Sequence, residues 1–173
     1  LANLAMPFLD KLRATVDETS NLLVLDGYEV LYIAQSESTK LLKMFTQLGA
    51  KAPLYCTGGG KAILAYKPLS FQEHALSKIN FIKYTENTIV TADSLRKEFE
   101  IIKKQGYSID NEEREEGITC VAAPIFDCYE EVIAAVSISG PSYRIKEKDL
   151  NSIISSVVLT AKEISANLGY AEK

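Results

Sequence analysis

The sequence predicts an α+β fold in which helices flank a central antiparallel β-sheet. Two β-rich runs are joined by Asp26-Gly27, a dipeptide that favours a tight hairpin turn. Two further apolar runs lie on either side of a short turn at residues 127–130. Apolar residues recur at helical spacing elsewhere in the chain. Because the strands follow one another through hairpins and not through crossover helices, the sheet is expected to be antiparallel, with helices packed on it.

The N-terminal half is expected to begin with a helix, continue through three strands and end in two short helices. Apolar residues from Ala5 to Val16 recur at helical spacing, and Pro7 is tolerated in the first turn of a helix. Residues 21–26 and 28–35 form the predicted hairpin, and residues 40–46 are predicted as a third strand. Glycines open a short helix at 58–66, and Ser70 is expected to cap another helix that ends at residue 79.

The C-terminal half contains the clearest predicted helix, at residues 91–105. Thr91 is a favourable N-cap, and Gly106 stands where a C-terminal glycine is typical. Strands are predicted at residues 107–110, 118–126 and 131–139. A long helix over residues 146–168 is expected to close the fold, with Gly169 ending it. No internal repeat or linker is visible, so residues 1–173 are expected to form a single domain.

The composition limits the possible partners of the chain. It has 173 residues, a formal net charge of −4 and a pI near 5.2, which argue against a surface that grips nucleic acid or a polybasic membrane anchor. No apolar run is long enough to cross a membrane, and no signal peptide is visible. The three cysteines form no CxxC motif, which suits the reducing cytoplasm. Because the chain begins at Leu1 instead of Met, it is expected to be a fragment of a longer protein.

The segment from Cys56 to Lys61 contains three consecutive glycines before a lysine. A phosphate-binding P-loop would need glycine at position 55 and serine or threonine at position 62, where this chain has Tyr55 and Ala62. Glycines at a helix N-terminus can instead offer backbone N–H groups to a small anion such as a carboxylate. The alternative is a tight loop whose glycines adopt positive φ.

The last predicted strand has one face made of small residues. Counting by the period of two, Val132, Ala134, Val136 and Ile138 share one face, and Ile133, Ala135, Ser137 and Ser139 share the other. Small residues leave room above the sheet, and the two serine hydroxyls could hydrogen-bond a ligand. Serines at a solvated strand end are the equally simple alternative.

The candidates for catalysis are weak. Cys120 could be a nucleophile, a metal ligand or a small core residue, but His74 is the only histidine and has no visible connection to it. The cysteines and His74 show no metal-ligand spacing. The charged run at residues 112–116 is typical of a solvated loop. Asp110 differs because it ends an apolar strand, where it can point inward and contact a ligand.

These residues, taken in order, resemble the effector-binding domain of the IclR family of bacterial transcriptional regulators. The resemblance covers nearly the whole chain and is most specific in three blocks, at residues 52–65, 106–127 and 132–141. It implies a GAF-like fold, and a full-length protein with an N-terminal winged helix-turn-helix domain that binds DNA and is absent from this chain. It also implies assembly into dimers or tetramers, partly through the first or last helix.

The resemblance also implies an effector site for a small carboxylic or sugar acid, with no cofactor and no metal. Gly58 and Gly59 would offer backbone N–H groups to the carboxylate of the effector. The other polar contacts would come from Asp110, Cys120, Ser137 and Ser139, and the apolar wall from Leu41, Met44 and Ile118. One departure is the run of three glycines at 58–60, where such proteins often carry serine or alanine.

Two other functions are weighed against an acid sensor. Some GAF-like proteins reduce methionine sulfoxide with several cysteines, and this chain has three. Such chemistry needs an exposed thiolate and a resolving partner, whereas Cys120 lies in an apolar strand and Cys128 lies in the following turn. A purely structural oligomerisation domain would bind no ligand.

Overall fold

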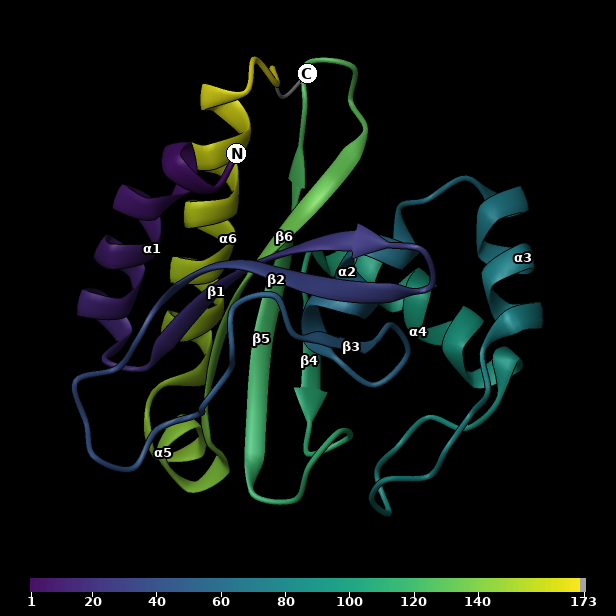
Figure 1. The fold of residues 1–173 in the computed structure, drawn as a ribbon, viewed down its shortest axis with the longest axis horizontal. Coiled ribbons are helices and arrows are strands. Elements are labelled where there is room, and N and C mark those ends of the chain that lie inside the picture. The colour runs from purple at the N-terminus through teal and green to yellow at the C-terminus, as the bar shows by residue number, and fades with distance from the viewer. Residues whose placement is uncertain (172–173) are drawn as a thin grey trace.

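The computed structural model describes residues 1–171, which form a six-stranded antiparallel sheet with helices on both faces (Figure 1). The strands are β1 Thr19–Asp26, β2 Glu29–Ser36, β3 Lys51–Pro53, β4 Ser108–Asn111, β5 Ile118–Phe126 and β6 Val132–Pro141. The helices are α1 Ala2–Val16, α2 Gly58–Ala65, α3 Leu69–Lys78, α4 Ala92–Gln105, α5 Ser142–Glu147 and α6 Leu150–Asn167. The strand order β3-β2-β1-β6-β5-β4 confirms the predicted α+β fold with an antiparallel sheet.

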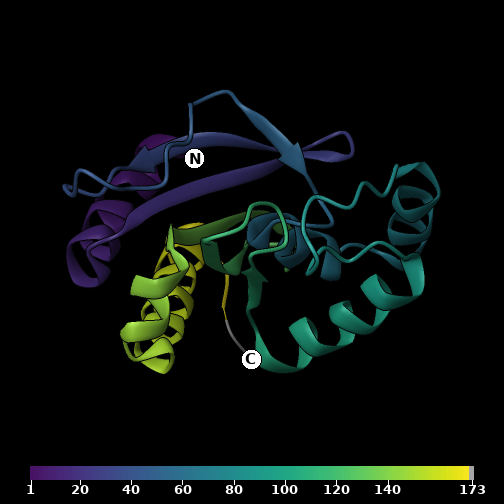
Figure 2. The same cartoon turned by 90° about the horizontal axis from the view of Figure 1, so that it is seen from below.

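Two apolar cores, one on each face of the sheet, hold the helices in place. On one face α1 and α6 pack side by side, and Leu9, Leu22 and Val157 are buried there (Figures 1 and 2). Helices α2, α3 and α4 contribute to the core on the other face, together with Leu23 of β1. Leu22 and Leu23 are consecutive and face opposite cores, as the period of a strand requires. Burial on both faces therefore specifies the register of β1, because a one-residue slip would exchange its faces.

The predicted first helix and first hairpin are confirmed, but the strand predicted at residues 40–46 is wrong. These residues belong to the loop between β2 and β3. Side chains hold the loop: Arg144 donates to the carbonyl oxygen of Leu42 over 2.7 Å, and Thr19 donates to that of Met44 over 3.5 Å. Because these carbonyl oxygens bond to side chains and not to a neighbouring strand, the third strand forms later, as β3.

The C-terminal predictions were correct for α4 and only partly correct for the last helix. Thr91 caps α4, and Gly106 ends it in the left-handed conformation with φ 83°. The helix predicted at 146–168 is two helices, α5 and α6, and the second begins at the N-cap Asp149. Ser70 is not a cap, because α3 already begins one residue earlier. Within the described residues, no helix combines the length and the apolar character needed to cross a membrane.

A bulge in β6 changes which of its residues face each core. The pairing of β5 with β6 shifts register between Ile125 and Phe126. As a result Val132 packs in the core of α2 and Ile133 packs against the core of α1 and α6, the reverse of the predicted faces. Beyond the bulge the predicted alternation holds, and one face carries Ala135, Ser137 and Ser139.

The three glycines of α2 allow the helix to approach its neighbours closely. None of them has a positive φ, so the tight-loop explanation is wrong. A Cβ atom on Gly60 would lie 2.4 Å from the carbonyl oxygen of Leu54, and one on Gly58 would lie 3.3 Å from Cβ of Ala122. Close backbone contact, and not backbone conformation, is therefore the reason for glycine at position 60.

We expect Gly60→Ala to lower the free energy of unfolding by about 1–3 kcal/mol, because the new methyl group would meet main-chain atoms that cannot move aside easily. Urea unfolding would measure the effect. Gly58→Ala is the matched control in the same turn and should cost much less, since alanine favours helices over glycine by about 1 kcal/mol. Equal unfolding midpoints for the two variants would contradict the assignment.

Candidate functional site

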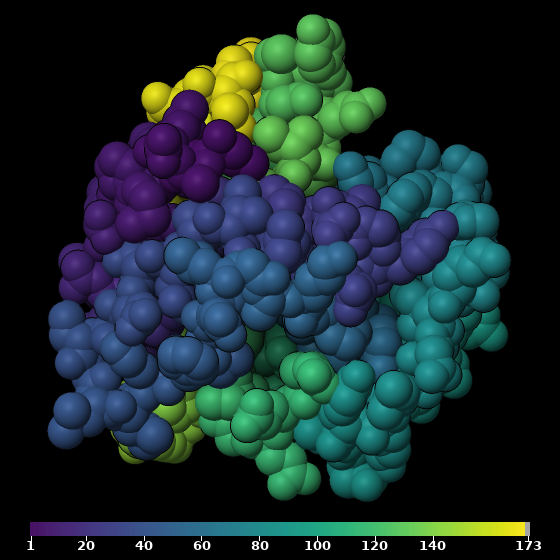
Figure 3. Space-filling view, in the orientation of Figure 1, coloured from purple at the N-terminus to yellow at the C-terminus, as the bar shows by residue number. Residues whose placement is uncertain are grey.

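A cavity of about 240 Å³ lies between the N-terminus of α2, one face of the sheet and the β2–β3 loop. In Figure 3 the surface is hollowed between the blue atoms of this loop and β3 and the green atoms of the turn that follows β4. All the predicted contact residues but one border the cavity: Gly58, Gly59, Asp110, Cys120, Ser137, Ser139, Met44 and Ile118. Leu41 does not, because residues 40–46 form a loop there and its side chain is fully exposed.

Strand pairing brings the polar candidates into adjacent rows on one face of the sheet. In one row Thr19 of β1 pairs with Ser139 of β6, and Ser139 pairs with Cys120 of β5. Cys120 in turn pairs with Asp110 of β4. The neighbouring row contains Gln35, Asn21, Ser137, Ala122 and Ser108. Because adjacent strands lie only about 4.8 Å apart, the four of these residues that border the cavity lie close together: Asp110, Cys120, Ser137 and Ser139.

Asn21 is a site residue that the sequence did not reveal. Its fully buried side chain donates from Nδ2 to the hydroxyl oxygens of Ser137, over 3.4 Å, and Ser139, over 3.3 Å. Its Oδ1 accepts from Gln35 over 3.1 Å. Each serine oxygen therefore accepts inside the protein, so the hydroxyl of Ser137 can donate into the cavity, while that of Ser139 also lies within reach of the Cys120 thiol. The only signal was a polar residue in an apolar strand, and the pairing of β1 with β6 was needed to interpret it.

The N-terminus of α2 supplies donors for an anion. The N–H of Gly60 bonds to the side chain of its N-cap, Thr57, and the N–H of Lys61 bonds to the carbonyl oxygen of Thr57. The N–H groups of Gly58 and Gly59 have no hydrogen-bond partner among residues 1–171. Both glycines border the cavity at the positive end of the helix dipole, where a carboxylate is stabilised.

Asp110 is almost fully buried beside the cavity. Its Oδ1 accepts a hydrogen bond from the N–H of Glu113 over 2.7 Å. Burial nevertheless raises the pKa of this carboxyl to about 7, and the nearby charge of Glu113 acts in the same direction. Near neutral pH the group therefore exists in both forms, and its neutral form can donate a hydrogen bond to a ligand oxygen.

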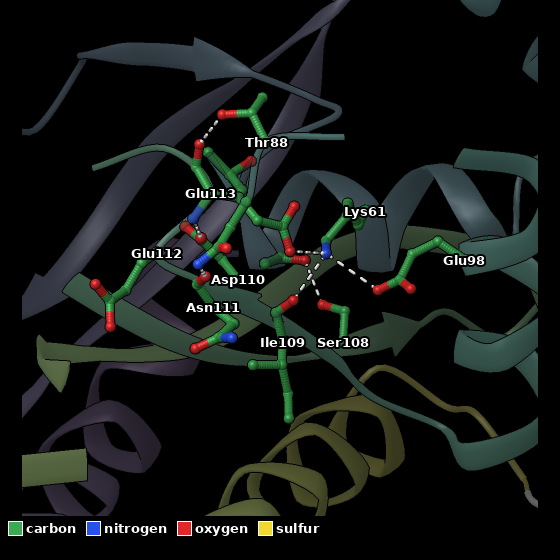
Figure 4. Close-up of polar contacts among 12 residues, drawn as sticks. Lys61, Thr88, Glu98, Ser108, Ile109, Asp110, Asn111, Glu112 and Glu113 are labelled. Atoms are coloured by element: carbon green, nitrogen blue, oxygen red, sulfur yellow. Dashed lines mark hydrogen bonds and ion pairs between the residues drawn. The ribbon is translucent and has the colours of Figure 1, made fainter. Parts of the chain in front are cut away.

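The charged run at residues 112–116 is not a wholly solvated loop, because Glu113 is buried. Its Oε1 lies 2.5 Å from Nζ of the fully buried Lys61, which also contacts Glu98 Oε1 at 3.0 Å and the carbonyl oxygen of Ile109 at 2.7 Å (Figure 4). Burial raises the pKa of Glu113, and the ammonium group of Lys61 opposes the shift. The run therefore anchors the turn after β4 to α2.

The cysteines are poorly placed for redox chemistry. Burial raises the pKa of the Cys120 thiol, as does the nearby charge of Asp110, so the reactive thiolate is disfavoured. Cys128 is exposed in the turn after β5, and the end of that strand at Phe126 is already about 20 Å from Cys120 at roughly 3.3 Å per residue. The ring of His74 lies 5.7 Å from that of Tyr28, at the tip of the first hairpin. Within residues 1–171 no His, Cys, Asp and Glu side chains are grouped as metal ligands.

The structure is an α+β domain with a cavity beside a helix N-terminus, and comparison with known proteins gives its family. The chain belongs to the family described as bacterial transcriptional regulator IclR C-terminal, which matches residues 1–166. The predicted membership of the IclR family is therefore confirmed.

The relatives of the chain are regulators of transcription. The HTH-type transcriptional regulator KdgR of Escherichia coli (strain K12) is 37% identical over 153 residues, which make up 88% of this chain and 58% of KdgR. The HTH-type transcriptional repressor AllR of the same strain is 36% identical over 169 residues, 96% of this chain and 62% of AllR. The chain thus spans a little over half the length of these relatives. Their function favours sensing over catalysis.

Solved structures show the same fold. The crystal structure of Thermotoga maritima IclR superposes with a TM-score of 0.92 at 38% identity, covering 97% of this chain and 68% of that one. The C-terminal domain of the E. coli regulator KdgR gives a TM-score of 0.88 at 33% identity, covering 97% and 98%. The predicted resemblance in fold to IclR effector domains is therefore confirmed.

The raised pKa of Asp110 predicts a pH-dependent effect of Asp110→Asn. Below about pH 4 this side chain is protonated in both the folded and the unfolded protein, and above about pH 7 it is ionised in both. Between these limits the folded protein keeps this proton while the unfolded chain loses it. The free energy of unfolding of the unmutated chain therefore falls as the pH rises. Asparagine cannot ionise but can still accept from the N–H of Glu113. The free energy of unfolding of Asp110→Asn, relative to the unmutated chain, should therefore rise between pH 4 and 7, by at most about 1.4 kcal/mol per pH unit.

Urea unfolding at a series of pH values would measure this difference. Asp93→Asn is the control, because this carboxylate is exposed on α4 and pairs with Arg96 at the surface. Its effect should change little over the same range. A flat difference for Asp110→Asn would show that the cavity does not raise the pKa of this group.

Proposed function

We propose that this chain is the effector-sensing domain of an IclR-type transcriptional regulator, and that it binds a small carboxylic or sugar acid in the cavity described above. The observation that carries the proposal is the pair of unpartnered N–H groups of Gly58 and Gly59 at the helix N-terminus. A ligand carboxylate would accept from both. The hydroxyls of Ser137 and Ser139, oriented by Asn21, would donate to its other oxygens.

The size of the cavity favours a small acid. Its 240 Å³ corresponds to about eight water molecules at roughly 30 Å³ each, which is below the usual volume of drug-sized sites. Asp110 and Cys120 would complete the polar contacts, and Met44 and Ile118 the apolar wall. Leu41 is left out of the proposed site because it is exposed.

Strand β1 offers a physical connection between this site and the first helix. Asn21 contacts the two serines on the cavity face, and the adjacent Ser20 donates to the carbonyl oxygen of Leu9 in α1 over 2.8 Å on the other face. A ligand that shifts β1 would therefore act on α1. In the full-length protein we propose that residues 1–173 act as one domain after a winged helix-turn-helix domain that binds DNA in the cytoplasm.

The proposed coupling is a difference in affinity between two states. The ligand can change DNA binding only to the extent that it binds one conformation or assembly more tightly than the other. Allosteric couplings of about 1–3 kcal/mol would change DNA affinity about 5–150-fold. Assembly into dimers or tetramers, partly through α1 or α6, would carry the change between subunits.

A thermal-shift screen of small carboxylates and sugar acids would test the site. An acid present at 100-fold its Kd should add about 2.7 kcal/mol to the free energy of unfolding and raise the melting temperature. We expect the double substitution Ser137→Ala and Ser139→Ala to abolish this shift. It should also lower the stability of the ligand-free protein, by about 1–3 kcal/mol, because the amide of Asn21 loses both acceptors.

Ser20→Ala is the matched control, since it removes a buried serine hydroxyl from the opposite face of the same sheet. It should lower stability while leaving the ligand-induced shift intact. Retention of the full shift by the double variant would place the ligand elsewhere. If no acid stabilises the unmutated chain, the proposed function is wrong.

A further inference from the structure

Arg114 places a positive charge at the edge of the proposed effector cavity. It borders the cavity and is itself exposed, so it lies where the cavity meets solvent. Lys51 also borders the cavity, but its Nζ is paired with Asp26 at 2.6 Å. Among residues 1–171 no carboxylate lies within ion-pair distance of the Arg114 guanidinium. Of the cations from residues 1–171 that border this cavity, Arg114 is therefore the one available to a ligand.

The guanidinium of Arg114 is held on an aromatic platform. Its central carbon lies 3.9 Å from the centre of the Tyr84 ring. A guanidinium stacked in this way uses its planar face for the ring and keeps its N–H edges free. Those edges match the two oxygens of a carboxylate, which they can bind in a bidentate manner.

The platform and the turn that carries Arg114 are joined by hydrogen bonds. The hydroxyl of Thr88 accepts from the N–H of Tyr84 over 3.1 Å and donates to the carbonyl oxygen of Glu113 over 2.6 Å (Figure 4). Thr85 likewise donates to the carbonyl oxygen of Glu112 over 2.6 Å. One hydroxyl therefore connects the main chain of the aromatic residue to that of the residue before Arg114, so the ring and the turn that carries the guanidinium are held together.

The charge of Arg114 also acts inside the cavity. Burial raises the pKa of the Tyr32 hydroxyl, which borders the cavity, and the positive charge of Arg114 opposes that shift. Negative groups that enter the cavity are stabilised by the same field. The neighbouring carboxylate of Glu115 also borders the cavity and weakens the effect.

We infer that Arg114 determines specificity by binding a second carboxylate at the outer end of the effector, so that the site prefers a short dicarboxylate. The inference rests on the proposed function, in which Gly58 and Gly59 bind the first carboxylate. A four-carbon dicarboxylate fits within the 240 Å³ of the cavity, because its covalently bonded atoms each occupy less than the roughly 30 Å³ of a separate water molecule. Arg114 then selects against acids of the same shape that carry one charge.

Isothermal titration calorimetry of the chain with succinate and with succinamate would test this inference. Succinamate replaces one carboxylate by an amide of nearly the same shape, so the two probes differ in charge and in the hydrogen-bond donors and acceptors at one end. Succinate should bind about tenfold more tightly or better, because hydrogen bonds between charged groups are the stronger ones. Arg114→Gln should weaken succinate binding by about the same factor and leave the binding of succinamate nearly unchanged.

Two further variants control the test. Arg96→Gln removes an exposed arginine that pairs with Glu73 on α3, away from the cavity, and should keep the preference for succinate. Glu115→Gln should strengthen succinate binding, since it removes a competing negative charge. Equal affinities of the unmutated chain for the two probes would overturn the inference, as would an unchanged preference in Arg114→Gln. If neither probe binds, the inference also fails, and the screen of other acids decides separately whether the cavity binds acids at all.

Discussion

A single buried ammonium group organises the half of the structure that contains the cavity. Nζ of Lys61 lies among the carboxylates of Glu98 and Glu113 and the carbonyl oxygen of Ile109. Charge removed from water in this way costs several kcal/mol unless partners replace its hydration. The partners come from α4, from the turn after β4 and from β4 itself. Satisfying one charge therefore holds three separate segments against α2, and the helix N-terminus that faces the cavity is fixed with them.

The cavity lies beside this buried ion pair, and different kinds of contact hold its two sides. On the floor, Glu113 binds Lys61 with its carboxylate and Asp110 with its N–H, so the ion pair also orients the acid at the cavity. On the other side, residues 37–50 of the β2–β3 loop belong to neither apolar core and are held by polar contacts. Arg144 reaches it while also pairing with the fully buried Glu18, at 2.7 Å. A floor fixed by a buried ion pair and a loop held by polar contacts alone suit a site in which a small ligand changes the balance between two conformations.

Elements with local signals were predicted well, and those defined by distant partners were not. The N-cap Thr91 and the C-terminal Gly106 directly adjoin α4, and β5 is a continuous apolar run. Residues 40–46 looked equally like a strand, but Arg144, about a hundred positions away, holds the Leu42 carbonyl in a loop. The run at 112–116 looked solvated because its charges are consecutive, and nothing local shows that Glu113 meets Lys61. Leu41 belongs to the loop that Arg144 holds. Its side chain therefore lies in solvent and not in the cavity wall, where it was expected.

By itself the sequence determined the fold class, most of the helices and strands, the family, and eight of the residues that border the cavity. Periodicity, caps and turn dipeptides act over a few residues, so they can be interpreted along the chain. Only the tertiary structure decided that Asn21 orients the two serines, that the glycines of α2 serve close packing, and that Arg114 stands beside the cavity on the ring of Tyr84. Each of these depends on contacts between segments far apart in sequence, which exist only after the sheet has paired and the helices have packed.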